Sequence, residues 1–223
     1  DDLLSRDAVS TAAVSLAPVF EIGTGVSRGL WSPTSPVRRL RAARIDDRSK
    51  RLGGLMASPP VFLVGAERSG TTLLGLMLGH HPLGGWAGEF AYAVDRIDAP
   101  NAWPDTGEYA AWLARDRVFR AGRFAIDHSC TYPELVDSFL SQCRLRAGKP
   151  LAGATVHRNF DRLVRVWPDA RLIHLVRDPR DVARSVVAMG WSGTMWHGVD
   201  RWLHAEATWE RLRQGARVFN NHP

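Results

Sequence analysis

Eight residues around position 70 have the spacing of a loop that binds an oxyanion. Residues 65–72 read Gly-Ala-Glu-Arg-Ser-Gly-Thr-Thr, with two glycines five positions apart. Glycine lets the backbone curl so that successive N–H groups point at one anion, and the start of a helix adds to the attraction. An apolar run at residues 61–64 precedes the loop and a helix-forming run follows it, which is the context that a phosphate loop requires. We therefore predict an anion site here.

The cation of this loop is an arginine inside it. Thr71 follows the second glycine, where a loop that hydrolyses ATP or GTP has a lysine for the β- and γ-phosphates. Arg68 supplies the positive charge instead, and its planar guanidinium can hold an oxyanion in a bidentate fork. These residues predict phosphate binding without NTPase chemistry.

A second anion site is predicted near residue 180. Arg177 ends the apolar run 172–176, and Ser185 lies eight residues on, about two turns into a helix that Asp178 caps. Parallel strands would bring this strand end to the same sheet edge as the glycine loop, where α/β proteins bind ligands. An arginine and a hydroxyl suit a second phosphate, although an ion pair of Arg177 with Asp178 or Asp181 is an alternative.

Together the two segments resemble the family of sulfotransferases that depend on PAPS (3′-phosphoadenosine-5′-phosphosulfate). The resemblance rests on Phe-Leu-Val-Gly-Ala-Glu-Arg-Ser-Gly-Thr-Thr at residues 62–72 and Leu-Val-Arg-Asp-Pro-Arg-Asp-Val-Ala-Arg-Ser at residues 175–185, and it covers roughly residues 60–212. The string Arg-Ser-Gly-Thr-Thr is closer to the bacterial and tyrosylprotein-type branch than to the cytosolic branch, which has Lys-Ser-Gly-Thr-Thr. The resemblance implies two sets of cofactor-binding residues: for the 5′ end of PAPS Arg68, Ser69, Gly70, Thr71 and Thr72, and for the 3′-phosphate Arg177 and Ser185.

The resemblance also implies a general base that takes the proton of the acceptor. Glu89, seventeen residues after Thr72, is placed like the catalytic glutamate of tyrosylprotein-type sulfotransferases. His157, twenty residues before Arg177, is placed like the catalytic histidine of the cytosolic branch. Both remain candidates, with Glu89 preferred; a surface carboxylate and a hydrogen-bonded histidine at a strand end are the non-catalytic alternatives. Arg68 is expected to neutralise charge on the bridging oxygen and the departing phosphate.

Two features depart from the family's pattern. Thr155 stands where a lysine is common, two residues before the histidine, and Arg158 is a candidate to replace that lysine beside the leaving group. The family also has a late loop with glycine and arginine over the adenine and the 3′-phosphate, whereas this chain ends at Pro223 soon after residues 214–218. We therefore expect a PAPS-binding domain over residues 60–223 that is truncated at its C-terminus.

Alternating strands and helices must position these residues. The apolar runs 61–64 and 172–176 predict buried strands. Helices are predicted over residues 73–78, 134–143, 160–167 and 199–213. The third has Phe160, Leu163, Val164 and Trp167 on one face, and the apolar stripe of the last is Val199, Trp202, Trp209 and Leu212. This order predicts an α/β fold with a mainly parallel sheet flanked by helices, a P-loop-like three-layer architecture. Residues 1–59 are predicted to be an N-terminal extension, packed on the domain or mobile.

Composition narrows the class of protein. The 223 residues are 45% hydrophobic and 23% charged, which excludes wholesale disorder, collagen and a coiled coil. The formal net charge of +6 comes almost entirely from arginine, since Lys50 and Lys149 are the only lysines. This bias suits a partner with phosphate or sulfate, although GC-rich coding would also produce it. With two cysteines, no signal-peptide pattern and no apolar run of about 20 residues, we expect a cytoplasmic protein without a transmembrane segment.

These observations predict a sulfotransferase that moves the sulfuryl group of PAPS to a hydroxyl or amine by in-line displacement. No metal is expected, because adjacent His80 and His81 would face different sides and no other ligand cluster is apparent. The acceptor can be a carbohydrate, a peptide tyrosine or a small natural product, and the tryptophans of the middle region, Trp86, Trp103 and Trp112, are candidates to line its pocket.

A non-catalytic binder of 3′,5′-phosphoadenosine and a P-loop nucleotide kinase are the alternatives. A nucleic-acid partner is not expected, since the arginines are scattered without interleaved aromatic residues. The oligomeric state stays open.

Overall fold

The computed structural model describes residues 13–16, 58–98, 102–191 and 193–219. Most of the predicted extension at residues 1–59 therefore lies outside the described residues. The part that is described includes a short strand, β1 (Ala13–Leu16).

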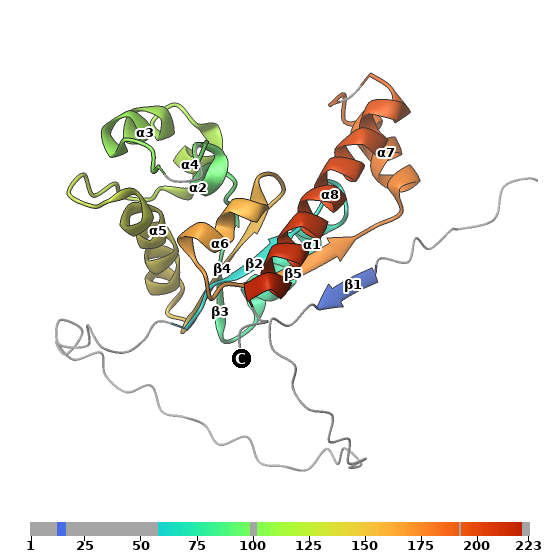
Figure 1. Ribbon diagram of the computed structural model, residues 1–223. Coiled ribbons are helices and arrows are strands. Elements are labelled where there is room, and N and C mark those ends of the chain that lie inside the picture. The colour runs from blue at the N-terminus through green and yellow to red at the C-terminus, as the bar shows by residue number, and fades with distance from the viewer. Residues whose placement is uncertain (1–12, 17–57, 99–101, 192, 220–223) are drawn as a thin grey trace, which may run out of the picture. The chain divides into compact units, whose positions relative to one another are not determined.

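The sheet has five strands, and the four that follow residue 60 run parallel. They are β2 (Val61–Val64), β3 (Gly84–Glu89), β4 (Leu151–Val156) and β5 (Arg171–Val176). The order across the sheet is β1-β5-β2-β4-β3, with β1 antiparallel to β5 at one edge and β3 at the other (Figure 1). Val64 pairs with Val156 on one side and with His174 on the other, so the carboxyl ends of β2, β4 and β5 lie together at the same end of the sheet. The predicted mainly parallel α/β fold is confirmed.

Helices follow the parallel strands. In chain order they are α1 (Thr71–His80), α2 (Tyr92–Asp95), α3 (Thr106–Leu113), α4 (Arg117–Gly122), α5 (Tyr132–Ala147), the 3-10 helix η2 (Phe160–Arg162), α6 (Leu163–Val166), α7 (Pro179–Ala188) and α8 (Met195–Phe219). None of the described helices is both long enough and apolar enough to cross a membrane.

The two faces of the sheet have different helices. Gly85 and Trp86 are neighbours in β3 and so face opposite sides. A Cβ atom on Gly85 would lie 3.1 Å from Ala147 of α5, whereas a Cβ atom on Gly75 of α1 would lie 2.9 Å from the Trp86 indole nitrogen. Helices α1 and α5 therefore cover opposite faces. Glycine at position 75 is what allows α1 to approach the sheet so closely.

The main core lies on the α5 face. Phe62 points to this side, and its ring lies 5.0 Å from that of Trp167, just after α6. His174 of β5 shares the face, and its ring stacks 4.4 Å from that of Trp209 on α8. The predicted packing of Trp209 toward the core is thus confirmed, and α5, α6 and α8 form one layer against this face.

Three predictions about elements need correction. Residues 160–167 are not one helix but a 3-10 turn followed by a single α turn, so the apolar spacing is three, with Phe160, Leu163 and Val166 facing inward while Val164 is 38% exposed. The last helix begins at Met195, earlier than predicted, and continues to Phe219. The middle region, for which no element before residue 134 was predicted, contains β3 and the three short helices α2, α3 and α4.

Candidate active site

The loop after β2 is shaped by three backbone positions with positive φ. Gly65 has φ 138°, and a Cβ atom there would lie 2.4 Å from the Leu175 carbonyl oxygen, so only glycine fits. Gly70, the N-cap of α1, has φ 100°, and Arg68 has φ 68°. No described side chain caps α1, and its first turn contains no acidic residue. The N–H groups at the start of α1 are therefore left for an anion.

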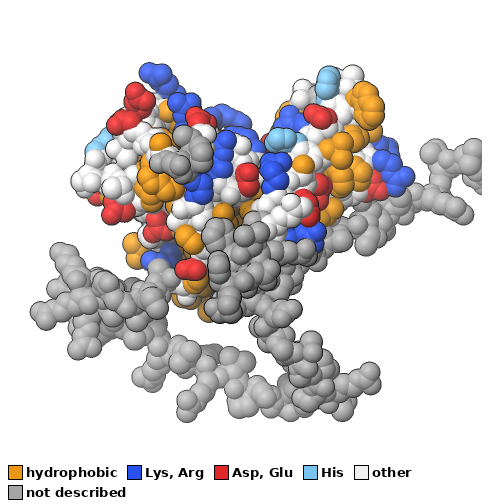
Figure 2. All heavy atoms as spheres, in the orientation of Figure 1, with side chains coloured by type: hydrophobic (Ala, Val, Ile, Leu, Met, Phe, Trp, Pro, Cys, Tyr) orange, Lys and Arg blue, Asp and Glu red, His pale blue; other side chains and the backbone are white. Residues whose placement is uncertain are grey.

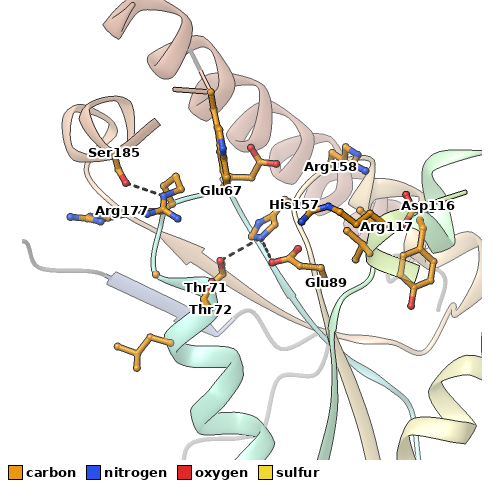
Figure 3. A pocket seen from close by; sticks show the side chains of 17 residues that line it. Glu67, Thr71, Thr72, Glu89, Asp116, Arg117, His157, Arg158, Arg177 and Ser185 are labelled. Carbon is orange, nitrogen blue, oxygen red and sulfur yellow. Dashed lines mark hydrogen bonds and ion pairs between the residues drawn. The ribbon is translucent and has the colours of Figure 1, made fainter. Parts of the chain in front are cut away.

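The two predicted anion motifs are in direct contact. The Arg68 Nε atom donates a hydrogen bond to Ser185 Oγ at 2.9 Å, and Arg177 donates to the Arg68 carbonyl oxygen at 3.2 Å. Arg177 also lies 3.6 Å from Asp181 on the next turn, so the ion pair that was considered as an alternative is present as well. Residues more than 100 positions apart thus meet at one sheet edge (Figure 3).

His157 and Glu89, the two candidate bases, touch each other. The His157 Nε2 atom lies 3.2 Å from Glu89 Oε1 and 3.5 Å from Thr71 Oγ1, and its Nδ1 atom lies 3.0 Å from the Gly65 carbonyl oxygen. The His157 side chain is 9% exposed, while that of Glu89 is 46% exposed. The imidazole therefore connects the glycine loop to the end of β3.

These contacts fix the protonation of His157. A carbonyl oxygen can only accept, so Nδ1 must donate to Gly65, and Nε2 must also carry a proton to hydrogen-bond an ionised Glu89. Burial by itself lowers the pKa of His157, but the hydrogen bond to Glu89, its negative charge and the Gly65 carbonyl outweigh burial and raise that pKa above its usual value. The geometry favours an imidazolium paired with a carboxylate.

A cavity of about 470 Å³ opens over these groups. Its lining includes Arg68, Gly70, Thr71, Thr72, Glu89, His157, Arg177 and Ser185 of the predicted site residues. Ser69 does not line it: the residue is buried, and its Oγ atom has no hydrogen-bond partner among the described residues. In Figure 2 a hollow separates the surface over α2–α4 from that over α7 and α8, and Lys and Arg side chains lie on both of its walls.

The comparisons with known proteins agree with this geometry. A family model described as the sulfotransferase family matches residues 59–222. This chain belongs to the sulfotransferase family. No curated protein and no solved structure matches the chain. The resemblance inferred from the two motifs is confirmed at the level of the family, and sulfuryl transfer is its general activity.

In this sulfotransferase, salt bridges hold the rim of the cavity. Glu67 in the glycine loop pairs with Arg201 of α8. Arg158 forms a two-pronged hydrogen bond to Asp95 at 2.9 and 2.6 Å, and Asn159 donates to the same carboxylate at 3.1 Å. Arg158, considered as a replacement for the family lysine, lines the cavity but is already bound to Asp95.

Thr155, which stands at the position of that lysine, points away from this cavity. Its Oγ atom accepts a hydrogen bond from the Trp86 indole N–H at 3.1 Å beneath α1. No group of three or more His, Cys, Asp or Glu residues suited to a metal occurs in the part of the chain that the structure describes.

Several residues that line the cavity were not predicted from the sequence, and Asp116, Arg117 and Trp191 are the most relevant to binding. Asp116 and Arg117 enter from the start of α4, and the Arg68 guanidinium lies 5.5 Å from the centre of the Trp191 ring. Asp116 caps α4 by accepting from the Phe119 N–H at 2.7 Å, so an Asp followed by a short helical run was a usable signal for that helix. Nothing local links Trp191 to the loop 123 residues before it.

Proposed function

We propose that this protein transfers the sulfuryl group of PAPS to the hydroxyl or amine of an acceptor. The single observation that carries the proposal is the contact of the two anion motifs, with Arg68 Nε 2.9 Å from Ser185 Oγ. A nucleotide with charged groups on both its 5′ and 3′ positions would engage both motifs at once. A nucleotide with a 5′-phosphate alone would engage one.

The residues of the glycine loop fit the phosphosulfate end. The start of α1 has N–H groups that no described side chain caps, whereas the Ser69 hydroxyl is buried outside the cavity. Thr71 and Thr72 line the same cavity, and Arg68 adds a positive charge. Arg177 and Ser185 would hold the 3′-phosphate. The ion pair between Arg177 and Asp181 is long, at 3.6 Å, and so leaves the guanidinium able to bind a phosphate.

The Glu89–His157 pair supports a division of labour in proton transfer. His157 uses Nδ1 on Gly65 and Nε2 on Glu89, so it has no free lone pair, whereas the half-exposed Glu89 can accept a proton from the acceptor. In the proposed step the acceptor oxygen bonds to sulfur and the bond from sulfur to the phosphate oxygen breaks. The acceptor proton passes to Glu89, and 3′,5′-phosphoadenosine leaves. Arg68 would neutralise charge on that leaving group.

Two alternatives make different predictions. A non-catalytic binder of 3′,5′-phosphoadenosine would distinguish the nucleotides yet transfer nothing. A nucleotide kinase needs a cation on the β- and γ-phosphates, and Thr71 stands where its loop lysine would be. Magnesium-dependent ATP turnover would favour the kinase.

The test of donor binding is calorimetric titration with 3′,5′-phosphoadenosine and with 5′-AMP. We expect the wild type to prefer the former at least tenfold, because a charge-assisted pair with the 3′-phosphate contributes about 1.5–3 kcal/mol. Arg177→Ala should lose this preference. Arg180→Ala is the matched control, since Arg180 lies only three residues after Arg177 but pairs with Asp178 and does not line the cavity. Equal affinities of the wild type for the two nucleotides would refute the proposal.

The test of the base is Glu89→Gln. We expect transfer from radiolabelled PAPS to a panel of hydroxyl acceptors to fall at least about 100-fold, with the affinity for 3′,5′-phosphoadenosine unchanged. His157→Gln serves as the comparison. Loss of activity in His157→Gln but not in Glu89→Gln would reverse the assignment of the base.

Folding should depend on pH through the same pair. Because the folded-state pKa of His157 is raised, its favourable contribution is fully present below about pH 6.5 and is lost as the pH rises through the folded-state value. The difference in unfolding free energy between wild type and His157→Gln should therefore shrink from pH 6 to pH 9. A difference that grows over this range would contradict the imidazolium assignment.

A further inference from the structure

We propose that a second cavity, a groove along the edge strand β3, binds the acceptor, and that it takes an uncharged, apolar hydroxyl compound. The inference rests on the proposed function. The groove has a volume of about 620 Å³, within the range of small-molecule sites. It lies between α1 and α5, the helices on opposite faces of the sheet, and so wraps around the edge of β3.

The groove meets the donor cavity at the residues where transfer would take place. Among their described lining residues the two cavities share two, Thr72 and Glu89. Thr72 is in the first turn of α1, where the 5′ end of PAPS is expected, and Glu89 is the proposed base; both are labelled in Figure 3. An acceptor in the groove would reach Glu89 from a cavity other than the one expected to hold the nucleotide. In-line displacement requires the attacking and leaving atoms to lie opposite each other.

The charges of the two cavities differ. The donor cavity is rich in charge, with four arginines, Arg68, Arg117, Arg158 and Arg177, against three carboxylates, Glu67, Glu89 and Asp116. Among the described residues of the groove the fully charged side chains are Glu89 and Arg146. Arg146 donates to the carbonyl oxygens of Gly122 and Arg123, and its guanidinium lies 4.8 Å from the centre of the Phe124 ring. An anionic acceptor would therefore meet a carboxylate and a cation that is already satisfied.

The walls of the groove are mostly apolar, and His80, Glu89 and Arg146 are the larger polar side chains among its described lining residues. Five glycines line it, Gly75, Gly79, Gly85, Gly88 and Gly122, together with Leu76, Ala87 and Phe124. No atom lies within 4 Å of where a Cβ atom of Gly88 would be, so space is open next to Glu89. These walls suit a flat apolar body with one hydroxyl.

Of the three tryptophans that were candidates for the acceptor pocket, Trp86 lines this groove. Its N–H is held by Thr155, and its ring lies against Gly153, where a Cβ atom would be only 2.3 Å from it. The other two tryptophans that were candidates for an acceptor pocket stack elsewhere, Trp103 on Tyr132 and Trp112 on Tyr109.

The test is calorimetric titration of 2-naphthol into the protein saturated with 3′,5′-phosphoadenosine. Leu76→Trp should weaken 2-naphthol binding at least tenfold, because Leu76 lines the groove and is 58% exposed, so that a larger ring obstructs the groove without disturbing the core. Met77→Trp is the matched control: Met77 is the next residue of α1, is 63% exposed and lines neither cavity. We expect it to bind 2-naphthol like the wild type. Leu76→Gln, which removes apolar surface without adding bulk, should weaken binding several-fold.

A charged analogue tests the chemical class. The carboxylate 6-hydroxy-2-naphthoate should bind at least tenfold more weakly than 2-naphthol. Undetectable 2-naphthol binding, equal losses in Leu76→Trp and Met77→Trp, or tighter binding of the carboxylate would each overturn the inference while leaving donor binding intact. Failure of the wild type to prefer 3′,5′-phosphoadenosine over 5′-AMP would instead overturn the proposed function, and this inference with it.

Discussion

Two strand-to-helix junctions lie side by side at one edge of the sheet, β2 to α1 and β5 to α7, and their helices begin in opposite ways. Helix α1 starts at Gly70 with no side-chain cap and no acid in its first turn. Helix α7 starts at Asp178, whose carboxylate accepts from the Arg180 N–H at 2.8 Å, and it has Asp181 in its first turn. The N–H groups of α1 are open to a ligand, while those of α7 are already used.

This difference implies that the two proposed anions would be held at one end of the sheet by different means. At α1 the backbone itself would be the binding group, and glycine is needed to shape it. At α7 the helix start is closed to anions by its own carboxylates, so an anion must be held by side chains, and Arg177 and Ser185 are in place to do so. If side chains capped both helices, neither anion could bind to backbone N–H groups.

Copying the acid of α7 into α1 should have the largest effect. Thr72→Asp puts a carboxylate in the first turn of α1, where it would repel a phosphate by about 3 kcal/mol or more. We expect the affinity for 3′,5′-phosphoadenosine to fall at least 100-fold in calorimetry, without loss of thermal stability, since the acid also suits the helix dipole. Thr72→Asn is the neutral control. Equal losses in both variants would mean that the Thr72 hydroxyl, rather than the open helix start, binds the anion.

Removing the cap of α7 should have a smaller effect, and on stability. Asp178→Ala leaves the start of α7 uncapped, and we expect the melting temperature to fall by about 3 °C, with donor affinity nearly unchanged. The hydrogen bonds from Arg180 lower the pKa of Asp178 to about 2. The contribution of Asp178 to stability is therefore present above about pH 4 and is lost as the pH falls toward this lowered pKa. Denaturant unfolding at pH 6 and pH 3 should show the difference from wild type narrowing at pH 3. A difference that persists unchanged at pH 3 would mean that the charge of Asp178 is not what stabilises α7.

The smallest effect is expected from freeing Arg177. Asp181→Asn removes the carboxylate 3.6 Å from its guanidinium and should raise the affinity for 3′,5′-phosphoadenosine two- to threefold, about the strength of an exposed ion pair. The affinity for 5′-AMP should not change. Asp169→Asn, which removes the same charge away from the cavity, is the control. An equal rise for both nucleotides would point to net charge rather than to the 3′-phosphate site.

The two junctions were also the parts of the fold that the sequence predicted best. Residues 61–64 and 172–176 form strands within one residue of the prediction, and the Asp178 cap is where the sequence indicated. Both signals are local: a short apolar run, and a carboxylate followed by proline. The edge strand β3 was missed, because Gly84, Gly85 and Gly88 give it little intrinsic strand preference and its state depends on pairing with β4.

The relation between the two candidate bases also lay beyond the sequence. Glu89 and His157 are 68 residues apart and were treated as alternatives, yet they are in contact. Their contact depends on the register of β3 against β4, which includes an irregularity between Trp86 and Glu89. That irregularity is a property of strand pairing, and no local pattern encodes it.

The anchors of the glycine loop have a consequence for synthesis on the ribosome. Three loop residues are held from progressively later points in the chain: Gly65 by His157, Arg68 by Ser185, and Glu67 by Arg201. The nascent loop emerges early, but its last anchor leaves the exit tunnel more than 130 residues afterwards. The proposed donor site is therefore completed only after α8 has been synthesised and has docked.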